Sequence, residues 1–151
     1  MGMKRGSDCE MLRRFFLVSC VAKKTSHRAR ASDLYISTWF QKARNLVEST
    51  GAPWFILSAA HGLLLPDKVV SPYERTLNKM SAAERRAWAV RVQGQLEAMA
   101  PESDEVVVLA GSKYREHLLP WLRARFGKVT IPMEGLPIGR QLSWMTHVAN
   151  L

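Results

Sequence analysis

Residues 54–63, which read Trp-Phe-Ile-Leu-Ser-Ala-Ala-His-Gly-Leu, join a short apolar run to small residues, a histidine and a glycine. A short, continuous apolar run is typical of a strand buried on both faces, as the strands of a parallel sheet are. Similar runs occupy residues 15–19, 106–110 and 129–132. We therefore expect four short buried strands.

Helical patterns separate these runs. Ser37 is a plausible N-cap for a helix that Gly51 ends, and a capping box at residues 81–84 starts a second helix. Apolar spacing predicts further helices around residues 118–122 and over residues 140–148. Strands that alternate with helices predict an α/β fold: a single three-layer domain with a short, mostly parallel four-stranded sheet and helices on both faces.

The chain has 151 residues, of which 47% are hydrophobic, and this suffices for one domain with a substantial core. We expect a basic N-terminal arm over residues 1–13 and a single α/β domain over residues 14–151. No apolar stretch approaches the roughly 20 residues that span a bilayer, and charges interrupt any signal-peptide core. Two cysteines, Cys9 and Cys20, form no disulfide framework, which favours a cytoplasmic protein.

The charge of the chain is strongly positive and uneven. The formal net charge is +9, and residues 1–30 hold eight Lys or Arg against two acidic residues. A clustered positive excess indicates a polyanionic partner, here nucleic acid and DNA in particular. The alternative is a solvated surface that keeps the protein soluble. No membrane partner is expected, and the oligomeric state stays open.

The carboxyl ends of parallel strands meet at one edge of a sheet, where ligands of such folds bind near the switch point. Four loops should therefore come together there, and they cover residues 19–24, 58–64, 110–114 and 133–140. A long segment without clear periodicity, residues 71–80, follows the second loop and suggests a functional loop.

These loops carry the candidate catalytic residues, which are His61, Glu134 and Ser19. The candidate substrate-binding residues are Lys23, Lys24, Ser58, Gly62, Tyr73, Asn78, Gly111, Lys113, Tyr114, Arg140 and Gln141. Histidine supplies acid or base chemistry near neutral pH, and the cations would hold phosphates. Each has a structural alternative: a hydrogen-bonded core histidine, solvated lysines, and a capping or solvated glutamate.

We expect no metal and no cofactor. The spacings His-Glu-x-x-His, Cys-x-x-Cys, Gly-x-Gly-x-x-Gly and the P-loop pattern are all absent from the chain. Two lysines beside each other, Lys23 and Lys24, leave open a lysine nucleophile with a lowered pKa.

A set of motifs resembles a bacterial and phage family known as a domain of unknown function. The set consists of residues 17–24, 55–63, 72–73, 109–111 and 134–139, so the resemblance covers roughly residues 15–145. More distantly, the His-Gly-Leu and Pro-Tyr pieces are similar to YaaA peroxide-stress proteins, which implies DNA binding. The architecture is similar in outline to the uracil-DNA glycosylase superfamily, although the Gly-x-Asp-Pro-Tyr and His-Pro-Ser motifs of that superfamily are missing.

These observations favour a DNA glycosylase-like enzyme that hydrolyses the N-glycosidic bond of a damaged or modified base in DNA. In this hypothesis His61 donates a hydrogen bond or proton to the departing base, Glu134 stabilises the sugar cation or orients water, and Tyr73 stacks on the base. The alternatives are a non-catalytic DNA-binding stress-response protein and an enzyme acting on free nucleotides.

Overall fold

The chain folds around a mixed five-stranded sheet. The computed structural model describes residues 13–19 and 24–149. The strand order is β4-β3-β1-β6-β7. The strands are β1 (Arg14–Ser19), β3 (Trp54–Ser58), β4 (Gly62–Leu64), β6 (Glu105–Leu109) and β7 (Lys128–Thr130). Four of these strands, β3, β1, β6 and β7, run parallel to their neighbours, and β4 pairs antiparallel with β3.

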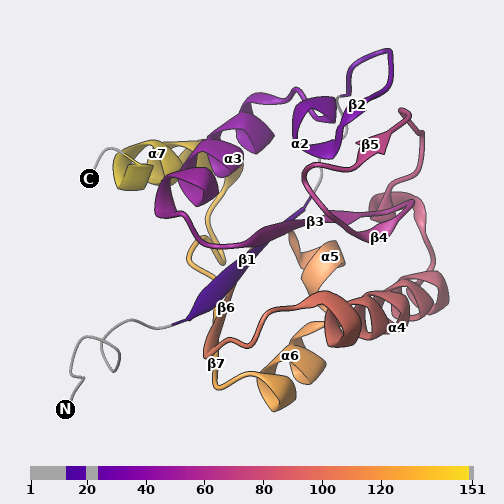
Figure 1. Cartoon of the computed structure of the whole chain (residues 1–151), viewed down its shortest axis with the longest axis vertical. Coiled ribbons are helices and arrows are strands. Elements are labelled where there is room, and N and C mark those ends of the chain that lie inside the picture. Colours follow the sequence, from indigo (N-terminus) through magenta and orange to yellow (C-terminus); the bar gives the residue numbers. More distant parts are fainter. Residues whose placement is uncertain (1–12, 20–23, 150–151) are drawn as a thin grey trace.

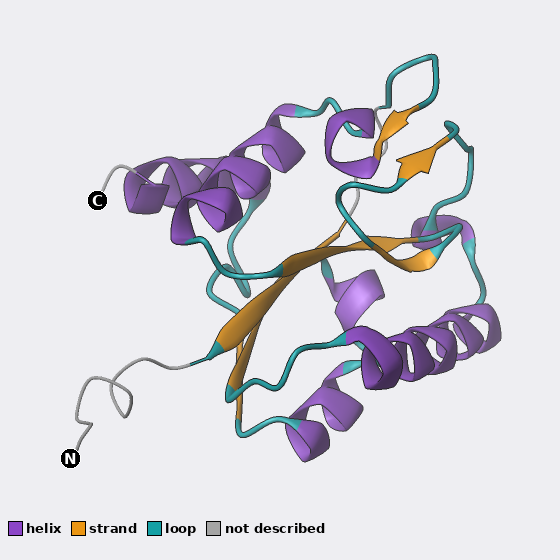
Figure 2. Ribbon diagram, in the orientation of Figure 1, coloured by secondary structure: helices purple, strands orange, loops and turns teal. Residues whose placement is uncertain are grey.

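Helices cover both faces of this sheet (Figures 1 and 2). One face carries α3 (Thr38–Thr50) and α7 (Ile138–Ala149), which pack against each other. The other face carries α4 (Ala82–Met99), α5 (Ser112–Arg115) and α6 (Leu119–Arg125). The predicted α/β class is therefore confirmed.

The predicted helix signals work as expected in two places. The Ser37 hydroxyl accepts a hydrogen bond from the Phe40 amide at the start of α3, which ends at Gly51 with φ of 74°. Ser81 and Glu84 form the full capping box of α4, because each side chain accepts from the other's backbone amide.

The expectation of four strands was incomplete. Residues 62–64, which we expected in an exit loop, form the fifth strand β4. Gly62 has φ of 71°, so the chain turns back sharply after β3. Leu63 and Leu64 then bury their side chains as the new strand pairs with β3. Three residues are too few to show the periodicity from which a strand is predicted.

Several short elements beyond β4 were also not predicted. A two-stranded antiparallel sheet joins β2 (Ala29–Arg30) to β5 (Val69–Val70). A short helix α2 (Ala31–Leu34) follows β2, and a single 3-10 turn η2 (Leu77–Lys79) lies in the long segment after β5.

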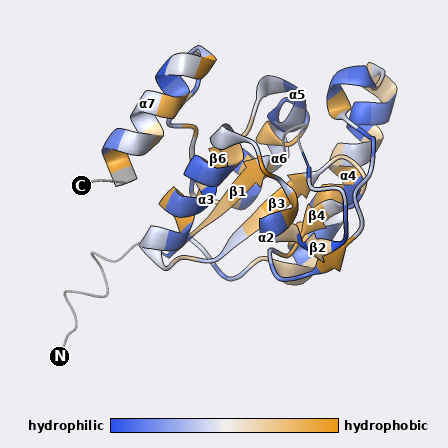
Figure 3. Cartoon of the chain, turned by 90° about the horizontal axis from the view of Figure 1, so that it is seen from above, coloured by the Kyte–Doolittle hydropathy of each residue, from blue (hydrophilic) through white to orange (hydrophobic). Residues whose placement is uncertain are grey.

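Apolar side chains of both helical layers meet at the central strands. Phe15 on β1 is fully buried, with its ring edge-on to Phe55 at 5.8 Å and to Phe126 at 5.3 Å. Figure 3 shows this concentration of hydrophobic residues along β1 and β6. Edge-to-face contacts between aromatic rings favour one packing of the layers, and this packing sets the positions of the strand ends.

The topology has a switch point between β1 and β6. From β1 the chain goes through α3 to β3 on one side, and from β6 it goes through α5 and α6 to β7 on the other. A crevice opens outside the carboxyl ends of two strands whose connections leave in opposite directions. Ser19 and Leu109, at which β1 and β6 end, flank this crevice.

Within the described residues, no helix is both long enough and apolar enough to cross a membrane. The proposed arm falls on residues 1–12, which lie outside the described residues, apart from Arg13 at its end.

Candidate functional site

A pocket of about 730 Å³ lies at the switch point, and we call it the Lys24 pocket. Its walls come from the segment after β1, from Tyr114 after β6, and from residues 72–79. Its lining residues are Lys24, Thr25, Ser26, Pro72, Tyr73, Glu74, Arg75, Thr76, Asn78, Lys79 and Tyr114. The structure thus brings together four predicted residues from three separate segments: Lys24, Tyr73 with Asn78, and Tyr114.

The hydroxyl of Tyr73 fixes one wall of this pocket to the sheet. It lies 2.7 Å from Ser58 Oγ at the end of β3 and 2.5 Å from the Tyr35 hydroxyl. Ser58 Oγ also accepts a hydrogen bond from the His61 amide at 3.1 Å. The side chains of Ser58 and Tyr35 are buried, so this network holds the segment 73–79 in one place. We call residues 73–79 the strap.

Lys24 lies against the aromatic rings of this network. Its Nζ is 4.5 Å from the centre of the Tyr73 ring and 5.8 Å from that of Tyr35. An ammonium over an aromatic face is attracted by the ring's quadrupole. The positive charge predicted after β1 is therefore held at the pocket wall. The neighbouring Lys23, also predicted to bind substrate, lies outside the described residues.

One face of α4 holds the turn between β3 and β4 through its backbone. Trp88 Nε1 donates to the Ser58 carbonyl at 2.9 Å, and Arg91 Nη1 donates to the Ala60 carbonyl at 3.1 Å. Gln95 Nε2 donates to the His61 carbonyl at 3.1 Å, and Gln95 Oε1 accepts from the Leu63 amide at 2.7 Å. Side chains spaced along one helix face thus satisfy the polar groups of the turn that carries His61.

His61 sits beside Tyr73 at the edge of the site. Its ring is edge-on to the Tyr73 ring, with centroids 5.4 Å apart. Partial burial, together with the charges of Arg91 and Lys68, holds the pKa of His61 below its usual value of 6.5. These surroundings favour the neutral imidazole, which can donate from one nitrogen and accept at the other.

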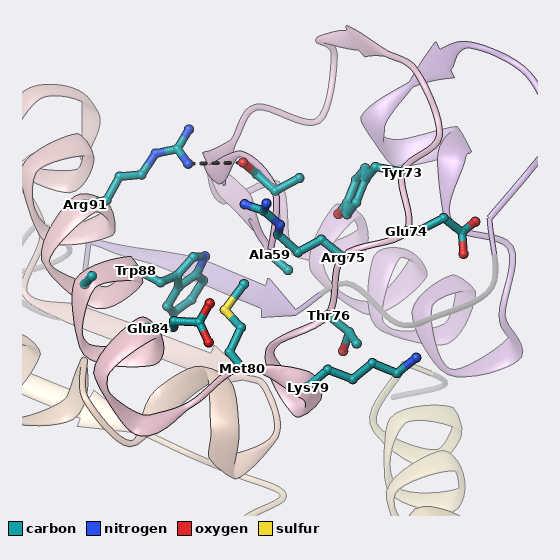
Figure 4. Close-up of a pocket in the computed structure, with 12 residues that line it drawn as sticks. Ala59, Tyr73, Glu74, Arg75, Thr76, Lys79, Met80, Glu84, Trp88 and Arg91 are labelled. Carbon is teal, nitrogen blue, oxygen red and sulfur yellow. Dashed lines mark hydrogen bonds between the residues drawn. The ribbon is translucent and has the colours of Figure 1, made fainter.

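A second pocket, of about 860 Å³, lies on the other side of the strap. We call it the Trp88 pocket. It is lined by Ala59 and Ala60, by residues 73–76, 79 and 80, and by Glu84, Ala87, Trp88 and Arg91 of α4. Figure 4 shows Arg75 pointing toward Ala59 and Trp88, whereas Glu74 and Lys79 point away from them.

Other predicted residues lie around a third, small pocket of about 170 Å³, which includes Gly111 and Gln141. Gln141 is bonded on both sides, because its Oε1 accepts from Trp39 Nε1 at 2.8 Å and its Nε2 donates to the Leu136 carbonyl at 2.7 Å. Glu134 lies 4.0 Å from Arg115, with 59% of its side chain exposed. These contacts tie the last loop to α3 and α5.

The structure does not bring Glu134 to His61. The strands that precede them, β7 and β3, are separated by β6 and β1. Three strand spacings of roughly 4.8 Å place the two strand ends about 14 Å apart. Both residues lie at the carboxyl edge of the sheet, as predicted, but one small group cannot touch both.

The remaining predicted residues are dispersed. Ser19 ends β1 and is 4% exposed. Lys113 and Arg140 are exposed on α5 and α7, and neither lines the Lys24 or the Trp88 pocket. Gly62 serves the turn, through its positive φ and its contact with Gln95.

Sequence reasoning missed the residues that build the two large pockets from outside the strand exits. Arg75 and Lys79 contribute cations to the lining, the buried Tyr35 bonds to the Tyr73 hydroxyl, and Gln95 clamps the turn. For Arg75 and Lys79 the sequence contains one signal, which is the aromatic and basic composition of residues 73–79. A glutamine on the inner side of a helix carries no signal that it will bond a distant turn.

Gly62→Ala tests the clamp on the His61 turn. A Cβ on Gly62 would lie 2.3 Å from Gln95 Oε1, so Gln95 must leave its bonds to Leu63 and His61. Gly135→Ala is the matched control, since Gly135 also has positive φ, 82°, but has nothing within 4 Å of the added Cβ. Urea unfolding should show a loss of about 1–2 kcal/mol for Gly135→Ala and a larger loss for Gly62→Ala.

In a Gln95→Ala background, the cost of Gly62→Ala should fall to that of Gly135→Ala, because the clash has gone. Equal costs for Gly62→Ala in both backgrounds would show that Gln95 does not clamp the turn.

Arg91→Ala should raise the pKa of His61, because it removes a nearby positive charge. The pKa should remain below 6.5, since burial is the larger cause and is retained. An NMR titration of the histidine ring protons measures this, with His61→Gln used to assign the resonance. Arg86→Ala is the matched control: Arg86 is an exposed arginine of the same helix and does not contribute to the shift.

An unchanged midpoint in Arg91→Ala, or an equal rise in Arg86→Ala, would contradict this assignment. Since the folded pKa lies below the unfolded one, His61 also makes the protein less stable as the pH falls through the folded pKa. His61→Gln should remove that part of the acid destabilisation.

Comparison with known proteins places this site in a family. The uncharacterized protein YfjM of Bacillus subtilis (strain 168) is 31% identical over 114 residues, which cover 71% of this chain and 75% of YfjM. A family model of unknown function also matches the chain, and this confirms the nearer resemblance predicted from the motifs. The more distant ones, to YaaA proteins and to the uracil-DNA glycosylase superfamily, stay predictions. Residues 15–147, which hold both large pockets, match the family of unknown function DUF6884, and the chain belongs to that family.

Proposed function

We propose that this protein binds DNA and takes an unpaired base into the Lys24 pocket, where it hydrolyses the N-glycosidic bond of a damaged or modified base. The observation that carries the proposal is the composition of this pocket at the switch point. Its volume, about 730 Å³, lies within the range of small-molecule sites, and its walls contain cations, two tyrosine rings and short polar groups.

The charges of the pocket suit a nucleotide. Lys24 and Lys79 line it, together with Glu74 as the carboxylate among its described lining residues. Arg75 also lines it, although its side chain points toward the Trp88 pocket (Figure 4). Phosphate contacts through such side chains supply most of the affinity of proteins for nucleic acids. The net charge of +9 supports a polyanionic ligand, and the predicted resemblance of the His-Gly-Leu and Pro-Tyr pieces to YaaA proteins favours DNA.

The polar groups suit the edge of a base. Thr25, Ser26 and Asn78 line the pocket with two hydroxyls and an amide. An amide can donate and accept at once, and so can read paired donor and acceptor groups on a base. A base that enters a pocket, in contrast to one read in the major groove, must leave the duplex stack, as in enzymes that flip their target nucleotide.

The proposed chemistry adds water across the bond between the base and C1′ of the sugar. The base leaves with both bonding electrons, the water oxygen bonds to C1′, and the proton that the water loses ends on the departing base, through solvent. His61 is the group we propose to stabilise the departing base, by a hydrogen bond from its neutral imidazole across the edge of Tyr73. We assign no catalytic role to Glu134, because it follows β7, whereas His61 follows β3.

A second candidate function is DNA binding without catalysis. It is favoured by the position of His61, which adjoins Tyr73 but is not among the lining residues of the Lys24 or the Trp88 pocket. In that case the pocket recognises an unpaired base and releases it unchanged.

Two measurements on the full chain separate these functions. Genomic DNA with diverse base modifications is incubated with the protein, and released bases are identified by mass spectrometry. Catalysis predicts release that His61→Gln slows at least about tenfold with little change in DNA affinity, whereas Glu134→Ala leaves release unchanged.

DNA affinity measured against salt concentration tests the pocket itself. Lys79→Ala should lower the salt slope by about 0.7–0.9 for one lost phosphate contact. Lys113→Ala is the control, as Lys113 is also an exposed lysine but lines neither large pocket. Binding without base release would leave the second candidate, and no binding at low salt would end both.

A further inference from the structure

The Trp88 pocket is not used by the function proposed above, yet it shares a wall with the Lys24 pocket. The residues common to both are Tyr73, Glu74, Arg75, Thr76 and Lys79. The two pockets are therefore adjacent, with the strap as their common wall. A ligand that fills one pocket can continue over the strap into the other.

The Trp88 pocket has an apolar floor and a cationic rim. Ala59 and Trp88 are buried in its floor, beside Met80 and Ala87. Arg75 points across it in Figure 4, and Arg91 borders it from α4. Apolar surface suits the face of a base, and guanidinium groups suit a phosphate.

Of the two carboxylates that line this pocket within the described part of the chain, that of Glu84 lies beside Trp88 and that of Glu74 points outward (Figure 4). Glu84 Oε1 accepts the Ser81 amide in the capping box, and the charge of Arg75 helps to lower the pKa of Glu84. Glu74 points away from Ala59 and Trp88 (Figure 4). Two cations, Arg75 and Arg91, therefore face one carboxylate, that of Glu84, on the pocket side, which leaves a net positive rim among the described lining residues.

The strap that separates the pockets is fixed at several points. Leu77 is fully buried, the Tyr73 hydroxyl is bonded to Ser58 and Tyr35, and the Thr76 hydroxyl caps the turn η2. Both pockets are thus formed before any ligand arrives, which lowers the entropic cost of binding.

We propose that the Trp88 pocket is a second nucleotide subsite, so that the ligand is single-stranded DNA with consecutive nucleotides on the two sides of the strap. This rests on the function proposed for the Lys24 pocket and names its substrate class. Two adjacent bases cannot both enter pockets while they remain paired. A single strand should therefore bind this site more tightly than a duplex.

The test is a comparison of ligands of increasing length, measured by competition against a labelled single-stranded oligonucleotide. The ligands are thymidine monophosphate, the dinucleotide pdTpdT, a single-stranded hexanucleotide and a duplex. The dinucleotide should bind at least about fivefold more tightly than the mononucleotide, as expected for one additional base contact. The hexanucleotide should bind more tightly than the duplex.

A blocking variant locates the second subsite. Ala87→Phe places a ring in the Trp88 pocket from an exposed position of α4, and should reduce the dinucleotide's affinity to that of the mononucleotide. Ala83→Phe is the matched control, one helical turn earlier, exposed and outside the pocket lining. It should leave both affinities unchanged.

The outcomes distinguish the subsite from the function on which it rests. If none of these nucleic acids binds, the function proposed for the Lys24 pocket fails first. If the mononucleotide binds but the dinucleotide gains nothing, or if Ala87→Phe and Ala83→Phe behave alike, only the second subsite is overturned. Equal competition by an acidic heptapeptide, heptaglutamate, would also overturn it, because the rim would then recognise charge alone.

Discussion

The hydroxyl of Tyr73 is the point on which the site depends. It joins the strap to Ser58 at the end of β3 and to the buried Tyr35, and the ammonium of Lys24 lies over its ring. Each hydrogen bond contributes only about 0.5–1.5 kcal/mol, but the phenol belongs to both pockets. A movement of this one side chain would change the shape of both, so the network acts as the common wall of the site.

The turn between β3 and β4, which carries His61, is held by the strap on one side and by α4 on the other. The side chains of Trp88, Arg91 and Gln95 form hydrogen bonds with backbone groups of residues 58–63. The side chains of Ser58 and His61 contact Tyr73. The turn is thus fixed between a helix face and the strap. This arrangement explains why a left-handed glycine follows the histidine, since the chain must reverse close to Gln95.

Much of the fold could be predicted because buried strands and helix caps are local signals. The four parallel strands and the caps at Ser37 and Ser81 follow from apolar runs and short-range spacing. β4 could not be predicted in this way, because its pairing depends on the reversal at Gly62. The site was predicted in part: the strand exits placed Lys24, Ser58 and Tyr114 near one another. The separation of His61 from Glu134 depends on strand order, which apolar patterns do not specify.

The central claim is that an unpaired nucleotide occupies the Lys24 pocket. NMR mapping with ¹⁵N-labelled protein and a short single-stranded oligonucleotide tests it most directly. The largest shifts are expected at the amides of Thr25, Ser26 and Tyr114 and at the side-chain amide of Asn78, which line the pocket. Largest shifts at Lys113 and around Arg140, with those four signals unmoved, would contradict it.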